Sequence, residues 1–181
     1  MNSNKSQMHF TVRWVALVVW GIACLAFLPA ISHAQSAESV KQAMALLKAK
    51  TAKLGAPSIK GEEMIAEKSV PALYFGTTKM NNNNALVDQI KNEVGSTATL
   101  FVKNGEDFVR VATNVQKDDG SRAIGTVLDP QGKAIAAIHS DKPYYGEANI
   151  LGKPYITGYE PIQDSSKKVI GIYYVGYPKT Q

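Results

Sequence analysis

Between residues 97 and 177 the chain alternates short apolar segments with turn sequences, and this pattern leaves few folds open. Apolar runs on either side of a short polar or glycine-containing dipeptide are the usual signal of a β-hairpin. Two such hairpins and a last strand can be read directly: 98–103 with 108–114 around Asn104-Gly105, 144–150 with 153–161 around Leu151-Gly152, and 169–176 after Asp164-Ser165-Ser166. The stretch therefore predicts a five-stranded antiparallel sheet.

Three other segments have the apolar spacing of amphipathic helices, at residues 36–54, 84–94 and 131–140. In the second of these, Asn84 suits the N-cap and Gly95 the helix end. Its inward positions are spaced three or four residues apart: Leu86, Val87, Ile90 and Val94. Residues 62–68 predict one or two further helical turns. Segment 123–128 is read either as a short strand or as an extended entry to the third helix.

The turn and strand sequences also resemble a known family. The resemblance rests on Phe108-Val-Arg-Val-Ala-Thr-Asn, Asp119-Gly-Ser-Arg-Ala-Ile-Gly-Thr, the segment 146–162, and Val169-Ile-Gly-Ile-Tyr-Tyr-Val-Gly-Tyr-Pro. Together they resemble the extracellular Cache sensor domains of bacterial receptors, in the single-Cache group related to Cache types 2 and 3. The resemblance extends over residues 57–177. It implies an α+β, PAS-like fold, with a long N-terminal helix, a five-stranded antiparallel sheet, helices on one face and a pocket facing them.

The N-terminus has the features of a secretory signal peptide. Lys5 and Arg13 precede an apolar run over 14–30, and Ser32-His33-Ala34 provides small residues for cleavage before residue 35. An uncleaved membrane anchor is the alternative, and a lipoprotein with its lipid on Cys24 is a further one. We therefore expect three parts: a signal peptide over 1–34, an N-terminal helix over 35–56 and a ligand-binding domain over 57–181. The expected location is periplasmic or secreted.

Composition excludes several classes of site. Cys24 is the only cysteine and would be lost with the signal peptide, so neither a disulfide nor a thiol nucleophile is expected in the domain. His139 is the only histidine outside the first 34 residues, and it is expected at the end of the third helix. Since catalytic triads and zinc sites need several converging side chains, we expect no metal, no cofactor and no enzyme activity. The basic residues are scattered, which argues against nucleic acid as a partner.

Candidate ligand-binding residues come from strand alternation. In 108–114, one face is expected to carry Phe108, Arg110, Ala112 and Asn114, and the other face the valines. From the residues alone, Arg110 could equally point to solvent; the family resemblance favours the pocket, where a guanidinium would grip a carboxylate. The second hairpin adds aromatics and a cation. The predicted pocket residues are Arg110, Tyr144, Lys153 and Tyr155.

These observations predict a secreted sensor domain that binds a short organic acid and passes the signal to a separate protein, such as a membrane receptor or sensor kinase. The chain ends after the last predicted strand, so no signalling region is expected to follow. One alternative is a structural or assembly partner without a ligand, which would form a homodimer through the N-terminal helix. A small secreted enzyme on a PAS-like scaffold is another alternative, although no nucleophile–base pair is evident.

Overall fold

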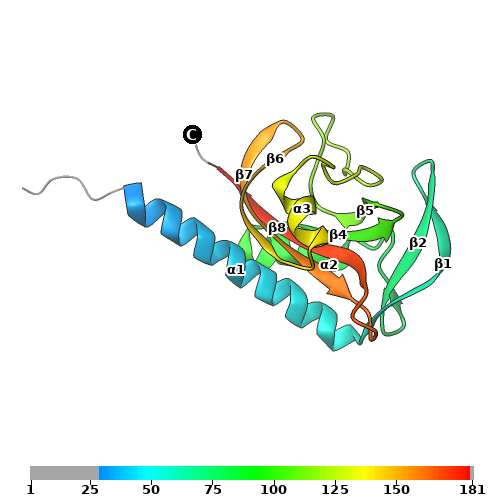
Figure 1. The fold of residues 1–181 in the computed structure, drawn as a ribbon. Helices are drawn as coiled ribbons and strands as arrows, with labels where there is room; N and C mark the ends of the chain where they lie inside the picture. Colours follow the sequence, from blue (N-terminus) through cyan, green and yellow to red (C-terminus); the bar gives the residue numbers. More distant parts are fainter. Residues whose placement is uncertain (1–28, 180–181) are drawn as a thin grey trace, which may run out of the picture.

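The computed structural model describes residues 29–179, with side chains for residues 37–179. The described part of the chain is an α+β domain with two antiparallel sheets (Figure 1). Its elements, in chain order, are α1 (Pro29–Leu54), β1 (Pro57–Ile65), β2 (Lys68–Phe75), β3 (Thr78–Lys79), α2 (Ala85–Val94), β4 (Thr97–Asn104), β5 (Asp107–Thr113), α3 (Lys133–His139), β6 (Tyr144–Ile150), β7 (Lys153–Gln163) and β8 (Val169–Pro178). None of the helices in this part is long and apolar enough to cross a membrane.

The central sheet confirms the predicted five antiparallel strands, in the order β5-β4-β8-β7-β6. The β6–β7 hairpin closes at the pair Ile150 and Lys153, and both loop residues have positive φ, 50° at Leu151 and 87° at Gly152. Two successive positive φ values give a turn whose twist matches that of the flanking strands. The β4–β5 hairpin closes at the pair Asn104 and Asp107, so its two loop residues are Gly105, with φ 63°, and Glu106. The hairpin is confirmed, but its turn lies one residue after the expected Asn104-Gly105.

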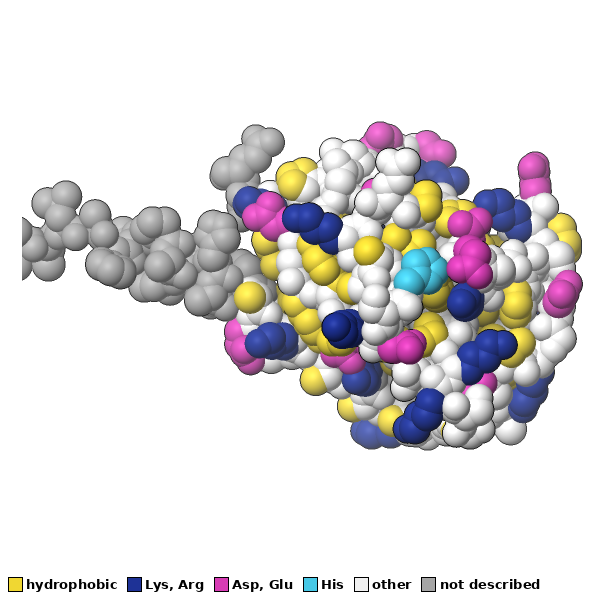
Figure 2. All heavy atoms as spheres, in the orientation of Figure 1, with side chains coloured by type: hydrophobic (Ala, Val, Ile, Leu, Met, Phe, Trp, Pro, Cys, Tyr) yellow, Lys and Arg dark blue, Asp and Glu magenta, His cyan; other side chains and the backbone are white. Residues whose placement is uncertain are grey.

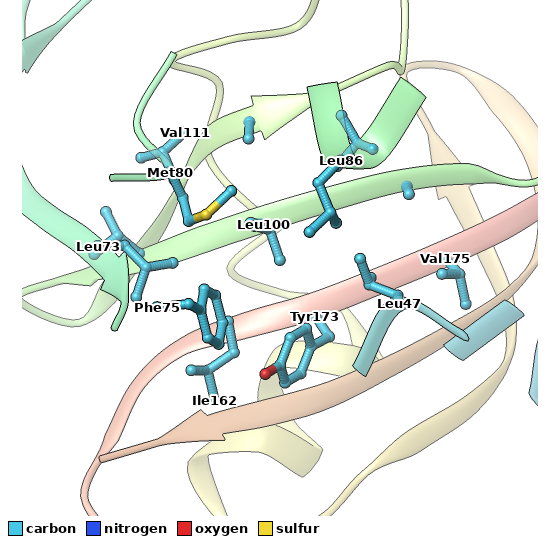
Figure 3. Close-up of a cluster of buried hydrophobic side chains, with 14 of the residues drawn as sticks. Leu47, Leu73, Phe75, Met80, Leu86, Leu100, Val111, Ile162, Tyr173 and Val175 are labelled. Carbon is cyan, nitrogen blue, oxygen red and sulfur yellow. The ribbon is translucent and has the colours of Figure 1, made fainter. Parts of the chain in front are cut away.

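One face of the central sheet is covered by α1 and α2. Helix α1 lies across β7 and β8 (Figure 1), where Val40, Ala43, Met44 and Leu47 are buried. Figure 3 shows side chains of α1, α2, the central sheet and β2 meeting in this cluster. The helix starts at Pro29, upstream of the expected start at residue 36; residues 1–28, most of the predicted signal peptide, lie outside the described residues.

Leu47→Ala should destabilise the domain because Leu47 is completely buried between α1 and the sheet. Removing a buried leucine side chain typically costs about 2–5 kcal/mol of unfolding free energy. Urea denaturation followed by circular dichroism will measure this loss. Leu46→Ala is the matched control, since Leu46 on the same helix is only partly buried. Equal losses in the two variants would show that α1 does not contribute to the core through this face.

Helix α2 follows the prediction with two corrections. Leu86, Val87 and Ile90 are buried, and Gly95 ends the helix with φ 71° and an N–H that bonds to the carbonyl of Lys91. Val94, expected inward, is 36% exposed because it lies in the last turn, beyond the sheet contact. Asn84 makes no side-chain cap; its Oδ1 instead accepts a hydrogen bond of 2.9 Å from the N–H of Thr113, which ties α2 to β5.

The prediction of helical turns over residues 62–68 was wrong. These residues belong to the β1–β2 hairpin, which turns at Ala66 with φ 54°. β1 is an edge strand and pairs only with β2, and it carries a register shift between Ile59 and Glu62. Most of its side chains are exposed, so the period-two alternation that marks a half-buried strand is missing from the sequence.

The opposite face of the central sheet packs against α3 and the loop that precedes it. A second cluster fills this side, with Phe101, Phe108, Tyr159 and Tyr174 among its largest members. Tyr173, the neighbour of Tyr174, lies in the first cluster, so the two tyrosines do point to opposite faces of β8 as alternation requires. Helices thus cover both faces of the sheet, whereas the resemblance implied one. His139 is the exposed last residue of α3, as expected.

Candidate ligand-binding cavity

A cavity of about 390 Å³ opens on the α3 side of the central sheet. It lies where β5, β6 and β7 approach the loop before α3 and the first turn of that helix. The wall combines polar and apolar side chains: Arg110, Val127, Leu128, Asp129, Gln131, Gly132, Lys133, Ala134, Tyr144, Glu147, Ala148, Asn149, Ile150, Leu151 and Tyr159. The cavity therefore collects residues from four separate parts of the chain.

A β-bulge places Arg110 on this face. Leu100 pairs with Ala112, but the next residue of β4, Phe101, pairs with Arg110, so Val111 is an extra residue in β5. A bulge of this kind changes which side chains share a face. Arg110 joins Phe101 and Phe108 on the cavity side. Simple alternation placed Ala112 on the same face as Arg110, and this prediction was wrong. Ala112 packs instead in the cluster under α1 and α2.

Arg110 is held firmly inside the protein. It is only 4% exposed, its guanidinium lies 4.9 Å from the ring centre of Phe101, and its Nη1 donates a 2.7 Å hydrogen bond to Oγ1 of Thr126. The Thr126 hydroxyl in turn donates to the carbonyl of Ala123. The backbone N–H of Arg110 also bonds to the carbonyl of Thr126, so the segment after β5 folds back and fixes the side chain.

The guanidinium is not fully satisfied. Its Nε is buried without a hydrogen-bond partner among the described residues. Arg110 is also the only charged residue classed as buried in residues 37–179. Burial lowers the pKa of Arg110 because it disfavours the charged form. An arginine nevertheless keeps its charge at neutral pH, so the cavity contains a fixed cation with unused donor capacity.

Two tyrosines lie beside this cation. Tyr144 and Tyr159 are cross-strand partners in β6 and β7, with ring centres 6.2 Å apart, and Tyr159 also contacts Tyr174 at 5.0 Å. Burial raises the pKa of Tyr144 and of Tyr159, so both hydroxyls stay protonated and can donate. The Tyr144 hydroxyl donates to the carbonyl of Glu147 at 2.7 Å. The Tyr159 hydroxyl makes no hydrogen bond to another of the described residues.

The remaining charged groups of the wall lie at its exposed rim. Asp129 accepts the N–H of Gln131 and starts the turn into α3, and Glu147 pairs with Lys179 at 2.6 Å. Lys133 is exposed on the first turn of α3. Since these groups are in contact with water, their interactions are weaker than those of a buried charge. The buried guanidinium therefore dominates the electrostatics of the interior.

The structure brings together two of the four residues predicted from the sequence. Arg110 and Tyr144 line the cavity. Lys153 does not, because it lies at the hairpin turn, with 64% of its side chain exposed and an ion pair to Asp118 at 3.0 Å. Tyr155 does not line it either, and packs at the margin of the cluster around Phe101.

Sequence reasoning did not select Tyr159, although a signal was present. A two-residue turn at Leu151-Gly152 pairs residue 144 with residue 159 by simple counting along the hairpin, which is the pairing observed. The loop residues Asp129 and Gln131 carried no comparable signal. Their approach depends on the chain folding back onto β5, which no local pattern specifies.

No group of histidine, cysteine or carboxylate side chains among the described residues is arranged to hold a metal ion. His139 contacts the ring of Phe108, 5.9 Å between ring centres, and is outside the cavity wall. The described side chains of the cavity are thus suited to binding a ligand through a cation, hydroxyls and apolar contacts.

The chain is similar in structure to the ligand-binding domain of the Campylobacter jejuni chemoreceptor Tlp3, solved in complex with L-valine. The similarity has a TM-score of 0.40 at 12% sequence identity and covers 82% of this chain but only 60% of that domain. No curated protein sequence matches the chain significantly.

The sequence itself matches a family model, the Cache 3/Cache 2 fusion domain, over residues 25–181. Cache domains are extracellular sensor domains that bind small molecules rather than transform them. Because the match covers most of the chain, the protein belongs to the Cache 3/Cache 2 fusion domain family.

Proposed function

We propose that this protein is a sensor domain that binds a short organic acid in the cavity around Arg110. The observation that supports this most is the buried guanidinium, whose Nε has no hydrogen-bond partner among the described residues. Buried polar groups are normally hydrogen-bonded, and leaving one unpaired costs free energy. A bound carboxylate would supply the missing acceptor and neutralise the charge at the same time.

The surroundings of Arg110 favour a carboxylate over a neutral ligand. A guanidinium presents parallel N–H groups that match the two oxygens of a carboxylate. The Tyr159 hydroxyl, protonated and near Arg110, can donate a further hydrogen bond. The apolar part of the wall, including Leu128, Ala134 and Ile150, suits a short carbon chain. A volume of about 390 Å³ limits the ligand to a small molecule.

The open cavity also bears on the alternative function. A structural or assembly partner without a ligand would be expected to have a filled interior between the sheet and α3. The observed cavity supports ligand binding instead.

The signal would leave the domain through α1. Tyr145 and Glu160 follow the cavity residues Tyr144 and Tyr159 in sequence and point to the other face of the sheet, where the Tyr145 hydroxyl donates to Glu160 at 2.5 Å. Glu160 also forms an ion pair with Lys48 of α1. Ligand binding would thus alter the contact between the sheet and α1. We propose that a separate partner outside the cytoplasm, such as a membrane receptor or a sensor kinase, recognises this altered contact, either on a monomer or on a homodimer. Cleavage of the signal peptide before residue 35 belongs to the same proposal.

A thermal-shift screen tests the proposal. The purified protein would be heated with propionate, lactate, pyruvate and succinate, and in parallel with neutral sugars and purines. A ligand that binds only the folded state stabilises it by about 2.7 kcal/mol at a hundred times its Kd, so the midpoint should rise with concentration for the acids. A rise with the neutral compounds alone would contradict the carboxylate assignment, and no rise with any compound would favour the assembly-partner alternative.

A further inference from the structure

A second hollow lies at the end of the central sheet where β8 begins, away from the Arg110 cavity. It is a groove of about 600 Å³ between the start of β1, the β4–β5 turn and the β7–β8 turn. It shares no lining residue with the cavity. Its apolar walls come from two different sheets: Pro57, Ile59 and Pro71 on one side, and Val169 and Ile170 on the other. Ile59 is 37% exposed, which leaves an apolar surface open to solvent.

The charge of this groove is positive. Lys103 from the end of β4 and Lys168 from the start of β8 both line it, and neither ammonium group is in an ion pair within the described residues. Asp164 is the only carboxylate of the lining. Its Oδ1 accepts hydrogen bonds from Ser166 and from the N–H of Lys168, and these bonds together with the nearby charge of Lys168 lower the pKa of Asp164. The lining therefore carries two cations and one carboxylate, which leaves a net positive charge. Figure 2 shows basic side chains, with some acidic ones among them, on the lower right part of the face in view.

The groove is also bordered by an unpaired strand edge. β1 is the outermost strand of the three-stranded sheet and pairs only with β2 (Figure 1). The backbone groups on the other edge of β1 take part in no sheet ladder among the described residues. An exposed edge of this kind can accept a further strand from another chain. The register shift between Ile59 and Glu62 divides β1 into two regularly paired parts, of which residues 57–59 lie beside the groove.

We propose that this groove is a docking site for an extended, acidic and apolar segment of a partner protein, which lies along the start of β1. In an extended segment successive side chains point to opposite sides. Apolar residues on one side would pack against Ile59, Pro71 and Val169, while carboxylates on the other side would reach Lys103 and Lys168 at the rim. The open backbone of β1 would supply the hydrogen bonds. A protein that reads the state of the domain thus has a surface that leaves the Arg110 cavity accessible.

The proposal can be tested with synthetic peptides. The probe is an eight-residue peptide of alternating glutamate and valine, capped at both ends and labelled for fluorescence anisotropy. Two matched peptides accompany it: one with lysine in place of every glutamate, and one with every backbone nitrogen methylated, which cannot donate backbone hydrogen bonds. We expect the acidic peptide to bind the purified protein, the basic peptide to bind at least tenfold more weakly, and the N-methylated peptide to lose binding.

Charge-reversal variants locate the site. The double variant Lys103→Glu with Lys168→Glu should weaken binding of the acidic peptide at least tenfold at low ionic strength. Lys142→Glu is the matched control, since Lys142 is exposed on the α3 side and outside the groove, and it should change binding less than twofold. Circular dichroism spectra of all variants establish that each is folded. Ile59→Asp adds a second variant that places a carboxylate in the groove itself.

Several results would overturn the proposal. Equal binding of the acidic and basic peptides would show that Lys103 and Lys168 do not attract the peptide. Undiminished binding of the N-methylated peptide would show that the peptide does not bind as an additional strand along β1. The same affinity in the double variant and in Lys142→Glu would place the peptide elsewhere. Self-association of the protein that is abolished by Ile59→Asp, without any peptide binding, would identify a second copy of this chain as the occupant instead of a different protein.

Discussion

Arg110→Ala should abolish the thermal stabilisation that short organic acids give to the wild-type protein. The substitution removes the buried cation and its unpartnered Nε from the cavity. Hydrogen bonds to charged groups contribute about 1.5–3 kcal/mol each, which corresponds to a roughly 10- to 100-fold loss of affinity. A carboxylate that met no cation in this partly dry site would also lose its own hydration without replacement.

The variant will also be less stable without ligand, because Arg110 packs on Phe101 and bonds to Thr126. The relevant measurement is therefore the ligand-induced change in midpoint for each variant, relative to its own unliganded midpoint. Arg110→Lys keeps the charge and most of the volume but loses the two-pronged geometry, so it should retain a reduced shift. If Arg110→Ala fails to fold, the lysine variant still decides the question.

Arg122→Ala is the matched control. Arg122 lies at the surface, where it pairs with Asp88 at 2.8 Å, and it is outside the cavity wall. Its loss should leave the ligand response unchanged, because surface ion pairs contribute little. A full response in Arg110→Ala, or an equal reduction in Arg122→Ala, would show that Arg110 does not hold the ligand.

Gly171→Ala should be among the most destabilising single substitutions in the central sheet. Gly171 lies in β8 between β4 and β7, and a Cβ at this position would stand 2.3 Å from the carbonyl oxygen of Phe101. That oxygen belongs to the backbone of β4 and cannot move unless the two strands separate. Overpacking of this kind costs about 1–3 kcal/mol and sometimes more, and we expect at least about 3 kcal/mol here because the contact is with backbone.

Urea denaturation will measure the loss of unfolding free energy in Gly171→Ala as a shift of the unfolding midpoint. Gly120→Ala is the control, because Gly120 has φ 80° in an open turn where a new Cβ meets nothing within 4 Å. Only backbone strain acts there, at a cost of roughly 1–2 kcal/mol. Unfolding free energies within 1 kcal/mol of each other for the two variants would contradict the close approach of β4 and β8. Since Phe101 also supports Arg110, Gly171→Ala should weaken acid binding as well.

The sequence was sufficient to predict those turns and helices that are formed by residues close together in the chain. The turn sequences near Asn104-Gly105 and Leu151-Gly152 indicated both hairpins, because Gly105 and Gly152 readily adopt the positive φ that a tight turn requires. The spacing of Leu86, Val87 and Ile90, with Gly95 after them, set α2. The family and the α+β class followed from the same stretch. The exposed edge strand β1 was missed because its polar side chains carry no alternating pattern.

The cavity was only half predictable. Alternation along β5 left the side of Arg110 open, and the family resemblance favoured the pocket. The bulge at Val111 moved Ala112 to the opposite face, and the position of a bulge depends on the pairing with β4. Lys153 shares a strand with Tyr159 but extends into solvent at the turn. Local sequence thus determined the two hairpins of the central sheet and helix α2. Only the tertiary structure decided which side chains surround Arg110, because the segment holding Thr126 folds back onto β5 through contacts between residues far apart in the chain.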